Sequence, residues 1–537
     1  MRTGPDWWRG AVVYQIYPRS YQDDNGDGIG DLPGITRRLD HIAALGVDAI
    51  WLSPIFTSPM RDMGYDVSDY TDIDPCFGTL ADFDALIARA HELGLKVLVD
   101  QVLNHSSSDH PWFKESSSSR DNPKSDWYVW VDPQPDGAPP NNWLSVMTGN
   151  AWEWEPRRRQ YYYHSFLKEQ PDLNYHNPAV REEMKKILHF WLDRGVDGFR
   201  LDTVNYFVHD EKLRDNPGKP PEAEWPPLNP YDMQLQKYSK SRPENVDWLK
   251  VIREITDQYA DRTLVGEVGD LDCAIPLMGE YTAGDDRLHM AYSFDMLSDI
   301  FTVAHFREVI EGFWKGAADG WPMWSMSNHD VVRHVSRWAE YDAGDDRLAR
   351  LAAAMLLSFE GTICLYQGEE LGQTDTELTY DELTDPIALK YWPESTGRDG
   401  CRTPMVWDES AANAGFSTHA APWLPVKPPQ AARAVANMGA GSILDFYREM
   451  IAFRRDTPQI DHGPMQFCDD VEPPLMHLVR GGTEGDGTTR IDCLFNLSLE
   501  TLTAPVPEGA RLIGPSQAAE INGGTLTLGP NGFAFVV

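Results

Sequence analysis

The sequence has 537 residues, of which 42% are hydrophobic, so it is long enough for one large domain of barrel size and one or two smaller appendages. Acidic side chains outnumber basic ones by 83 to 47, which gives a formal net charge of −36 and a pI near 4.7. This charge repels nucleic acid and anionic membrane surfaces and excludes both as partners, whereas a neutral small molecule is compatible with it.

The cysteines and the N-terminal segment indicate a compartment. Six cysteines are scattered along the chain without a CxxC pair, which argues against a zinc site and against a dense disulfide framework. The N-terminal segment has no basic stretch followed by an apolar one, and no apolar run approaches the length of a membrane span. We therefore expect a cytoplasmic protein whose cysteines are mostly reduced and buried. For the oligomeric state we expect a monomer or a homodimer.

An acidic loop follows the first predicted strand, Val12–Pro18. In DDNGDGIGD the oxygen-bearing residues are spaced as in the first nine positions of an EF-hand loop, with Gly28 at the sixth. The twelfth position is Gly34 instead of a bidentate glutamate, and the loop follows a strand, so this is not an EF-hand. The loop favours a hard cation, Ca²⁺ with Mg²⁺ also compatible, and an Asx-rich turn without metal is the alternative. The candidate ligands are Asp23, Asn25, Asp27, the Ile29 carbonyl and Asp31.

A repeated pattern then predicts the main fold. Three segments give an amphipathic helix, a glycine and a buried strand, with Gly46, Gly94 and Gly195 placed to cap the helices in the left-handed conformation. Such units build a parallel sheet, and eight strands favour an α/β fold of the (β/α)₈ TIM-barrel type. A doubly wound open sheet is the alternative, but it would normally carry a glycine-rich loop after its first strand, which YQIYPRSYQ is not. The other predicted strands are Ala49–Pro54, Lys96–Val102, Gly198–Asp202, Thr263–Val268, Ala291–Asp295, Trp321–Ser327 and Ile363–Glu370.

Two insertions and a tail depart from this pattern. The stretch 104–171 is too long for a barrel loop and too aromatic for disorder, so it is predicted to be an inserted subdomain. A second, proline-rich insertion, Asp215–Pro230, is expected to lie over the same end of the barrel as the first. After about Thr457, short alternating runs predict an antiparallel β-sandwich domain. The predicted division is barrel 1–103, inserted subdomain 104–171, barrel 172–457 and C-terminal domain 458–537.

Three apolar runs each stop on a carboxylate. They end at Asp202, Glu267 and Asp330, positions that a parallel sheet places at its carboxyl edge, where such sheets bind ligands. Unpaired charge at the mouth of a core costs free energy, so three such acids are hard to explain by stability. Arg200 stands two residues before Asp202, so both side chains are expected on one side of the strand, with the guanidinium holding the carboxylate ionised.

The motifs around these acids resemble the α-amylase family, glycoside hydrolase family 13, over essentially the whole chain. The resemblance rests on DQVLNH (100–105), GFRLDTVN (198–205), VGEVGD (265–270) and SNHD (327–330) in the correct order. Further segments are similar to its α-glucosidase and oligo-1,6-glucosidase branch: GYDVSDY (64–70), LYQGEELG (365–372) and GRDGCRTPM (397–405).

The resemblance implies a role for each matched residue. Asp202 would be the nucleophile, Glu267 the general acid and base, and Asp330 the carboxylate that orients the sugar, with the first two carboxyls roughly 5 to 5.5 Å apart for a retaining reaction. The resemblance further implies that His105 and His329 bind sugar hydroxyls and that Tyr65 stacks on the sugar. It implies that Asp62 and Arg398 close the pocket, with Arg402 as the alternative to Arg398, and that calcium or magnesium occupies the acidic loop.

The expected activity is that of an exo-acting, retaining α-glucosidase that forms a covalent glucosyl-enzyme intermediate. In the family branch, threonine or alanine after the nucleophile goes with α-1,4 cleavage and valine with α-1,6, so Thr203 favours maltose-like substrates, with sucrose also open. Transfer of glucose to hydroxyl acceptors is expected beside hydrolysis. The alternatives are an oligo-1,6-glucosidase, a sucrose hydrolase and a sucrose or trehalose isomerase. A noncatalytic barrel that partners a membrane transporter, or a carbohydrate-binding module, would lack the three acids.

Overall fold

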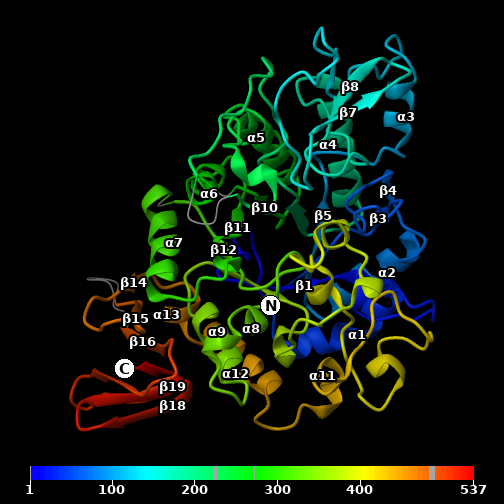
Figure 1. Ribbon diagram of the computed structural model, residues 1–537. Helices are drawn as coiled ribbons and strands as arrows, with labels where there is room; N and C mark the ends of the chain where they lie inside the picture. Colours follow the sequence, from blue (N-terminus) through cyan, green and yellow to red (C-terminus); the bar gives the residue numbers. More distant parts are fainter. Residues whose placement is uncertain (1, 222–225, 271, 318, 483–489) are drawn as a thin grey trace.

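Eight parallel strands form one sheet at the centre of the molecule (Figure 1). The computed structural model describes residues 2–221, 226–270, 272–317, 319–482 and 490–537. The strand order is β11-β10-β9-β5-β2-β1-β13-β12. The two outer strands meet through a parallel bridge between Ala291 and Pro322, so the sheet closes into a barrel as predicted, and the open-sheet alternative is wrong. The strands are β1 (Val12–Ile16), β2 (Ala49–Leu52), β5 (Lys96–Gln101), β9 (Gly198–Leu201), β10 (Thr263–Val268), β11 (Met290–Ser293), β12 (Met323–Trp324) and β13 (Thr362–Tyr366).

Amphipathic helices cover the barrel. In α4, the side chains on the predicted apolar face, among them Met184, Leu188 and Trp191, are buried, because a spacing of three and four residues keeps them on one side. Gly46, which caps α1, has φ 87°, a conformation open to glycine without strain. The helices are α1 (Leu32–Leu45), α2 (Leu80–Glu92), α4 (Pro178–Asp193), α5 (Asn245–Thr256), α6 (Ala274–Thr282), α7 (Val303–Gly316), α8 (His334–Arg337), α9 (Arg347–Leu356), α10 (Pro386–Tyr391), α11 (Pro428–Ala431), α12 (Ile443–Asp456) and α13 (Pro458–Asp461).

The segment after β5 folds outside the barrel. It carries α3 (Pro111–Ser118) and an antiparallel sheet of β6 (Trp130–Val131), β8 (Gln160–Tyr163) and β7 (Trp152–Glu155), in that order. The hairpin of β3 (Phe56–Thr57) and β4 (Asp69–Ile73) precedes it in the chain. Asn142 donates its side-chain amide N–H to the Asn216 carbonyl at 2.9 Å, so the two insertions are joined. Residues 222–225 of the second insertion lie outside the described residues.

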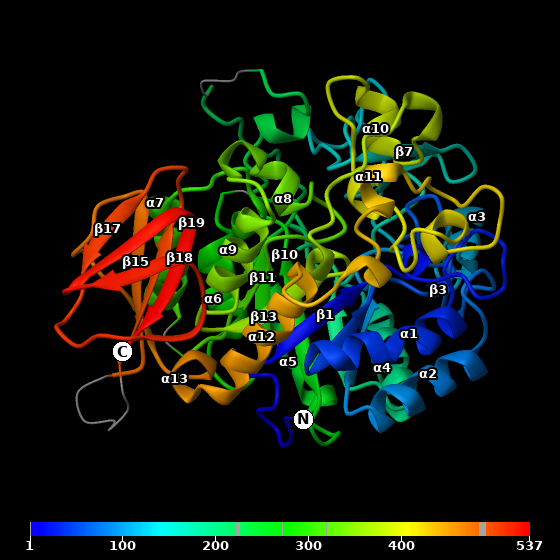
Figure 2. The same ribbon diagram turned by 90° about the horizontal axis from the view of Figure 1, so that it is seen from below.

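The C-terminal strands are antiparallel, as predicted, and all six belong to one sheet. Figures 1 and 2 show it beside α9 and α12, on the opposite side of the barrel from the segment with α3. Phe533 packs on Phe446, with ring centroids 5.7 Å apart, and Phe535 on Phe453, at 4.9 Å, so β19 is joined to α12 by aromatic contacts. The strands are β14 (Met465–Phe467), β15 (Leu475–Arg480), β16 (Ile491–Asn496), β17 (Leu502–Pro505), β18 (Leu512–Asn522) and β19 (Thr525–Val536).

Among the described residues, no helix combines the length and the apolarity needed to cross a membrane.

Candidate active site

Three carboxylates meet at the carboxyl-terminal edge of the barrel. Asp202 follows β9, Glu267 belongs to β10, and Asp330 lies in the loop after β12. All three line one cavity of about 200 Å³. Parallel strands of a closed sheet end at the same edge, so residues far apart in the sequence come together. The structure thus brings together the three acids that the sequence analysis assigned to one pocket.

Arg200 pairs with both Asp202 and Glu267. Its side chain is 1% exposed, and its Nη1 is 2.8 Å from Asp202 Oδ1 and 2.7 Å from Asp100 Oδ1. Its Nη2 is 2.8 Å from Glu267 Oε2. Arg200 and Asp202 are on the same side of their strand because side chains alternate with period two. One guanidinium therefore fixes both carboxylates of the expected reaction relative to each other.

Thr203 connects the same two acids from above. Its backbone N–H donates to Glu267 Oε2 at 2.9 Å and its hydroxyl to Asp202 Oδ2 at 3.2 Å. The residue has φ 40°, which is rare for a β-branched side chain and costs of order 1–3 kcal/mol. The strain is maintained by the surrounding bonds, so the conformation of Thr203 belongs to the construction of the site.

Burial raises the pKa values of both central acids. It raises the pKa of Glu267 to about 8, although Arg200 opposes the shift. It raises the pKa of Asp202 to about 7, so burial outweighs the effect of Arg200, which the sequence analysis expected to hold this carboxylate ionised. Glu267 has the higher value, and it therefore keeps its proton to a higher pH than Asp202 does. This order matches a division into acid and nucleophile.

Asp330 is stabilised as an anion. Its Oδ1 accepts from Arg402 Nη2 at 2.9 Å and is 3.4 Å from Arg398 Nη1, and its Oδ2 is 3.3 Å from His329 Nε2. Burial alone would raise the pKa of Asp330, but His329, Arg402 and Arg398 outweigh it and lower the pKa below its usual value. Asp330 is thus a fixed negative charge in the pocket, unlike the other two acids.

An ion pair closes one end of the cavity. Arg398 Nη2 is 2.9 Å from Asp62 Oδ1 and 3.0 Å from Asp385 Oδ1. Gln170 donates to Asp62 Oδ2 at 3.1 Å. Of the two arginines that the sequence analysis weighed for the contact with Asp62, Arg398 makes it, whereas Arg402 pairs with Asp330. The cavity is therefore bounded at this end by the ion pair of Arg398 with Asp62.

The predicted sugar-binding residues are arranged in two layers. Tyr65 and His105 line the cavity, and burial lowers the pKa of His105 to about 4, so its ring is neutral at pH 7. His329 is 0% exposed and stacks on Tyr65, with centroids 5.5 Å apart and an interplanar angle of 9°. Its Nδ1 is 2.8 Å from the Gln15 amide nitrogen and its Nε2 bonds the Tyr65 hydroxyl. His329 therefore contacts both Tyr65 and Asp330 and helps to fix their positions.

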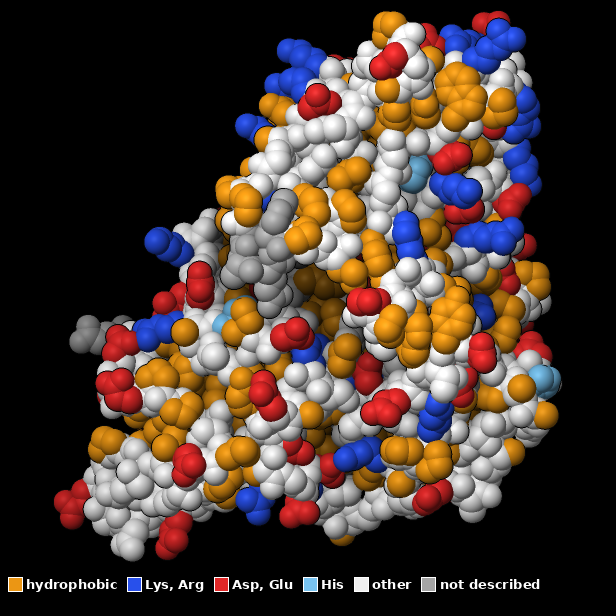
Figure 3. Space-filling model, viewed as in Figure 1, with side chains coloured by type: hydrophobic (Ala, Val, Ile, Leu, Met, Phe, Trp, Pro, Cys, Tyr) orange, Lys and Arg blue, Asp and Glu red, His pale blue; other side chains and the backbone are white. Residues whose placement is uncertain are grey.

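Apolar side chains also line the cavity. Figure 3 shows a hollow near the middle of the viewed face, with hydrophobic side chains along its edge. Val146, Met147 and Phe166 come from the inserted segment and line the cavity together with Phe294, which follows β11, and Ile387 of α10. The cavity thus offers charged and hydrogen-bonding groups together with apolar surface.

Sequence reasoning missed several residues that build this site. Asp100 accepts from Arg200 and, at 3.2 Å each, from Trp51 Nε1 and the Tyr65 hydroxyl. The Tyr292 hydroxyl accepts from Arg200 Nη2 at 2.8 Å and lies 3.3 Å from Glu267 Oε1. Asp100 is the penultimate residue of the buried strand β5, so an acid near the end of an apolar run is a signal that could have identified it. Gln170 and Asp385 come from loops without periodicity, where the sequence carries no comparable signal.

The acidic loop before α1 presents only oxygen donors. Asp23 accepts backbone N–H bonds from Gly26 and Gly28 at 2.6 and 2.8 Å, and Asp31 accepts from Gly34 at 2.7 Å. Asp23 Oδ2 also accepts from the Ser417 hydroxyl, and Asp31 Oδ2 accepts from two further backbone N–H groups. The lone pairs left for a ligand are therefore those of the two Oδ1 atoms, each of which accepts one bond. With Asn25, Asp27 and the Ile29 carbonyl, this donor set fits a hard cation.

Comparison with known proteins gives consistent matches over nearly the whole chain. The family described as alpha amylase, catalytic domain, matches residues 15–463. A probable alpha-glucosidase of Rhizobium meliloti (strain 1021) is 54% identical over 509 residues, covering 94% of this chain and 91% of its own. An oligo-1,6-glucosidase of Heyndrickxia coagulans is 38% identical over 94% of both chains. The crystal structure of an alpha-glucosyl transfer enzyme is similar with a TM-score of 0.92 and 45% identity over 99% of both chains.

Proposed function

This chain belongs to the α-amylase family as a glycoside hydrolase of the α-glucosidase branch, and from that premise we propose that it releases single glucose units from the nonreducing ends of short α-1,4-linked glucosides with retention of configuration. The observation that carries the proposal is the single cavity of about 200 Å³, lined by Asp202, Glu267 and Asp330 and closed by Asp62 and Arg398. Its size suits one sugar ring, and its closed end suits exo action.

In the first half of the proposed reaction, Glu267 protonates the glycosidic oxygen while an Asp202 carboxylate oxygen attacks the anomeric carbon. The bond to the leaving alcohol breaks, and a β-glucosyl ester of Asp202 forms. Arg200 and Thr203 hold the two carboxyls in place, and the anionic Asp330 stabilises the positive charge that develops on the ring. A separation of roughly 5 to 5.5 Å between the Asp202 and Glu267 carboxyls stays a prediction.

In the second half, Glu267 has become a carboxylate and removes a proton from the acceptor as it attacks the glucosyl ester. Water gives α-glucose, and a sugar or alcohol hydroxyl gives a new α-glucoside. The apolar wall with Met147, Phe294 and Ile387 supports binding of acceptors beside the glucose site. The resemblance to an alpha-glucosyl transfer enzyme points in the same direction.

The test is product analysis with maltose, isomaltose and sucrose, following the anomer by NMR and looking for trisaccharides. We expect α-glucose as the first product, faster turnover of maltose than of isomaltose, and some transfer product. Release of β-glucose would disprove retention. Faster cleavage of isomaltose would favour the oligo-1,6-glucosidase alternative, and conversion of sucrose to an isomer would favour an isomerase.

A single variant tests the nucleophile. Asp202→Asn removes the attacking anion while keeping the shape, so kcat should fall by at least about 10⁴-fold. The variant should bind maltose and keep the circular dichroism of the wild type. Turnover within about tenfold of the wild type would remove Asp202 from this role.

Three further properties belong to the proposal. We place Ca²⁺ in the loop of Asp23, Asn25, Asp27, Ile29 and Asp31 as a structural ion, with Mg²⁺ as the second choice. All six cysteines are free thiols, which supports a reducing compartment and a cytoplasmic location. The net charge supports small neutral partners and not nucleic acid. Size-exclusion chromatography with light scattering decides between a monomer and a homodimer.

A further inference from the structure

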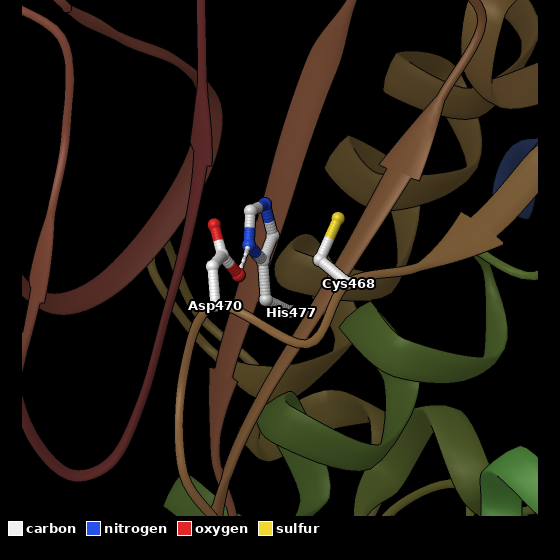
Figure 4. Close-up of side chains that lie close together, drawn as sticks. All are labelled: Cys468, Asp470 and His477. Atoms are coloured by element: carbon white, nitrogen blue, oxygen red, sulfur yellow. Dashed lines mark hydrogen bonds and ion pairs between the residues drawn. The ribbon is translucent and has the colours of Figure 1, made fainter.

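A second group of side chains with metal-binding chemistry lies in the C-terminal sheet, away from the active-site cavity. Cys468, Asp470 and His477 each present a ligand atom, and these atoms lie within 4.8 Å of one another. Figure 4 shows the His477 ring between the Asp470 carboxylate and the Cys468 thiol. The sequence analysis argued against a zinc site because no CxxC pair is present. That argument covers only ligands that are close in sequence, whereas the sheet brings these three residues together from two strands and a turn.

The strand register explains why they meet. Phe467 of β14 is paired with Leu478 of β15, so the next pair along is Cys468 and His477, and the Cys468 N–H donates to the His477 carbonyl at 2.9 Å. Directly opposite residues of antiparallel strands point to the same face with Cβ atoms about 4.5–5.5 Å apart. Asp470 returns to this face from the turn that follows.

The imidazole is held in the orientation that a metal ligand needs. His477 Nδ1 is 2.6 Å from Asp470 Oδ1, and its Nε2 is 2.8 Å from Asp492 Oδ1 on β16. Asp492 is fixed in turn by Arg490, whose Nε is 3.0 Å away. Histidines that bind metals usually donate their second ring N–H to a carboxylate, which fixes the ring and raises its basicity. Asp492 occupies this supporting position, so Nδ1 is the nitrogen left for the metal.

There is room beside the group for an ion to enter. A cavity of about 230 Å³, between the turn and α7, is lined by Cys468 and His477 together with Val303 and Arg307. Arg307 Nη1 is 2.5 Å from Asp469 Oδ1, so the turn that carries Cys468 and Asp470 is attached to the barrel. An ion bound here would join β14, β15 and the turn at the contact between the C-terminal sheet and the barrel.

We propose that Cys468, Asp470 and His477 bind one Zn²⁺ ion, with Asp492 as the positioning residue behind His477. A thiolate, an imidazole and a carboxylate form a donor set that suits zinc, and a water or an exogenous ligand completes the tetrahedron. Tetrahedral bonds of about 2.0–2.3 Å require ligand atoms about 3.4–3.8 Å apart. His477 Nδ1 and Asp470 Oδ1 are now 2.6 Å apart, so these side chains must move apart to admit the ion. On binding, the metal displaces the protons of the Cys468 thiol and of Nδ1.

The experiment uses the full-length protein, stripped with a chelator and titrated with Co²⁺ as a spectroscopic probe for the zinc site. Thiolate coordination gives a sulfur-to-cobalt charge-transfer band in the near ultraviolet, which the oxygen ligands of the acidic loop cannot produce. We expect this band to saturate at one equivalent of Co²⁺ and to disappear when Zn²⁺ is added. Lack of the band in the wild type overturns the proposal.

Matched variants assign the site. Cys468→Ser should abolish the band. Cys76→Ser and Cys273→Ser change the two other partly exposed cysteines, which lie outside the C-terminal sheet, and they should leave the band unchanged. Asp470→Asn, at an exposed position, should weaken Co²⁺ binding without disturbing the fold, and Asp492→Asn should weaken it by about 10–100-fold. Unchanged binding in Asp470→Asn, or loss of the band in Cys76→Ser or Cys273→Ser, would place the metal elsewhere and overturn the assignment.

Discussion

Among single residues, Thr203 contacts both central carboxyl groups from a strained backbone conformation. Its N–H holds Glu267 and its hydroxyl contacts Asp202, from a backbone with φ 40°. The side chain also lines the cavity, so it can affect both the reacting carboxyls and the group that leaves.

Thr203→Val therefore tests linkage preference. Valine keeps the shape but removes the hydroxyl that contacts Asp202, and it replaces a polar patch of the cavity by a methyl group. We expect the ratio of kcat/KM for isomaltose to that for maltose to rise by about tenfold. Thr203→Ala is the control and should keep the preference for maltose. Equal ratios in all three proteins would show that this position does not set linkage.

The raised pKa values predict a pH profile. Asp202 must be ionised and Glu267 protonated, so kcat/KM should rise with pH through about 7 and fall through about 8. Glu267→Gln should lower kcat by about 10²–10⁴-fold. It should also remove the alkaline limb of the residual activity. A profile that is flat from pH 5 to 10 would contradict the assignment of both groups.

The same shift predicts the effect of pH on stability. The pKa of Glu267 is higher in the folded than in the unfolded state, so the folded state binds more protons. Protonated Glu267 therefore adds to the free energy of unfolding at low pH. This contribution is lost as the pH rises through about 8. Glu267→Gln mimics the protonated form and should therefore raise Tm at pH 9 and leave it nearly unchanged at pH 5. Calorimetry at the two pH values checks the sign, and a lower Tm of the variant at pH 9 would contradict it.

At the scale of elements, the acidic loop links β1 to α1. Asp31 is both a candidate ligand and the N-cap of α1, where it accepts from Gly34 at 2.7 Å. Asp27 accepts the Ile29 N–H at 2.8 Å and does not cap a helix. The loop can thus be tested for metal binding without damage to the helix.

Chelation should lower Tm of the wild type by several degrees, and Ca²⁺ should restore it, because a ligand that binds only the folded state stabilises it. Asp27→Ala should abolish this calcium response. Asp24→Ala is the matched control, since Asp24 pairs with Arg37 and is not a candidate ligand, and it should respond as the wild type does. A Tm that is independent of calcium in the wild type would favour the Asx-rich turn.

The elements also show how far the sequence predicts the fold. All eight strands were found within a few residues, because buried parallel strands are continuous apolar runs. The seventh strand is much shorter than predicted: it was expected over Trp321–Ser327, and β12 has only two residues. Its later residues turn away to place Asn328, His329 and Asp330, a change of direction that apolar content does not reveal.

The three acids could be located from sequence because each ends such a run. Their environment could not, since the ion pairs of Arg200 with Asp100 and Glu267 and the partners of Asp330 depend on contacts between distant segments. The pKa of Asp202 is an example. Burial raises this pKa more than Arg200 lowers it, and the extent of burial cannot be read from the sequence.

At the scale of the whole molecule, the net charge of −36 predicts a response to salt. Like charges on a compact surface repel, and raising the ionic strength from about 0.01 M to about 0.15 M shortens the screening length from about 30 Å to about 8 Å. We expect Tm to rise by a few degrees over this range, equally in NaCl and KCl. A response to only one of the two salts would indicate a bound ion, and a falling Tm would contradict the dominance of repulsion.

The short β12 also has a consequence for motion. Asp202 and Glu267 adjoin strands that are bonded along their length to neighbours on both sides, whereas the loop of Asp330 follows a two-residue strand at the seam where the barrel closes through Ala291 and Pro322. Few ladder bonds resist local opening at such a place. We therefore expect backbone amides to exchange hydrogen faster in the loop of Asp330 than in β9 and β10, beside Asp202 and Glu267.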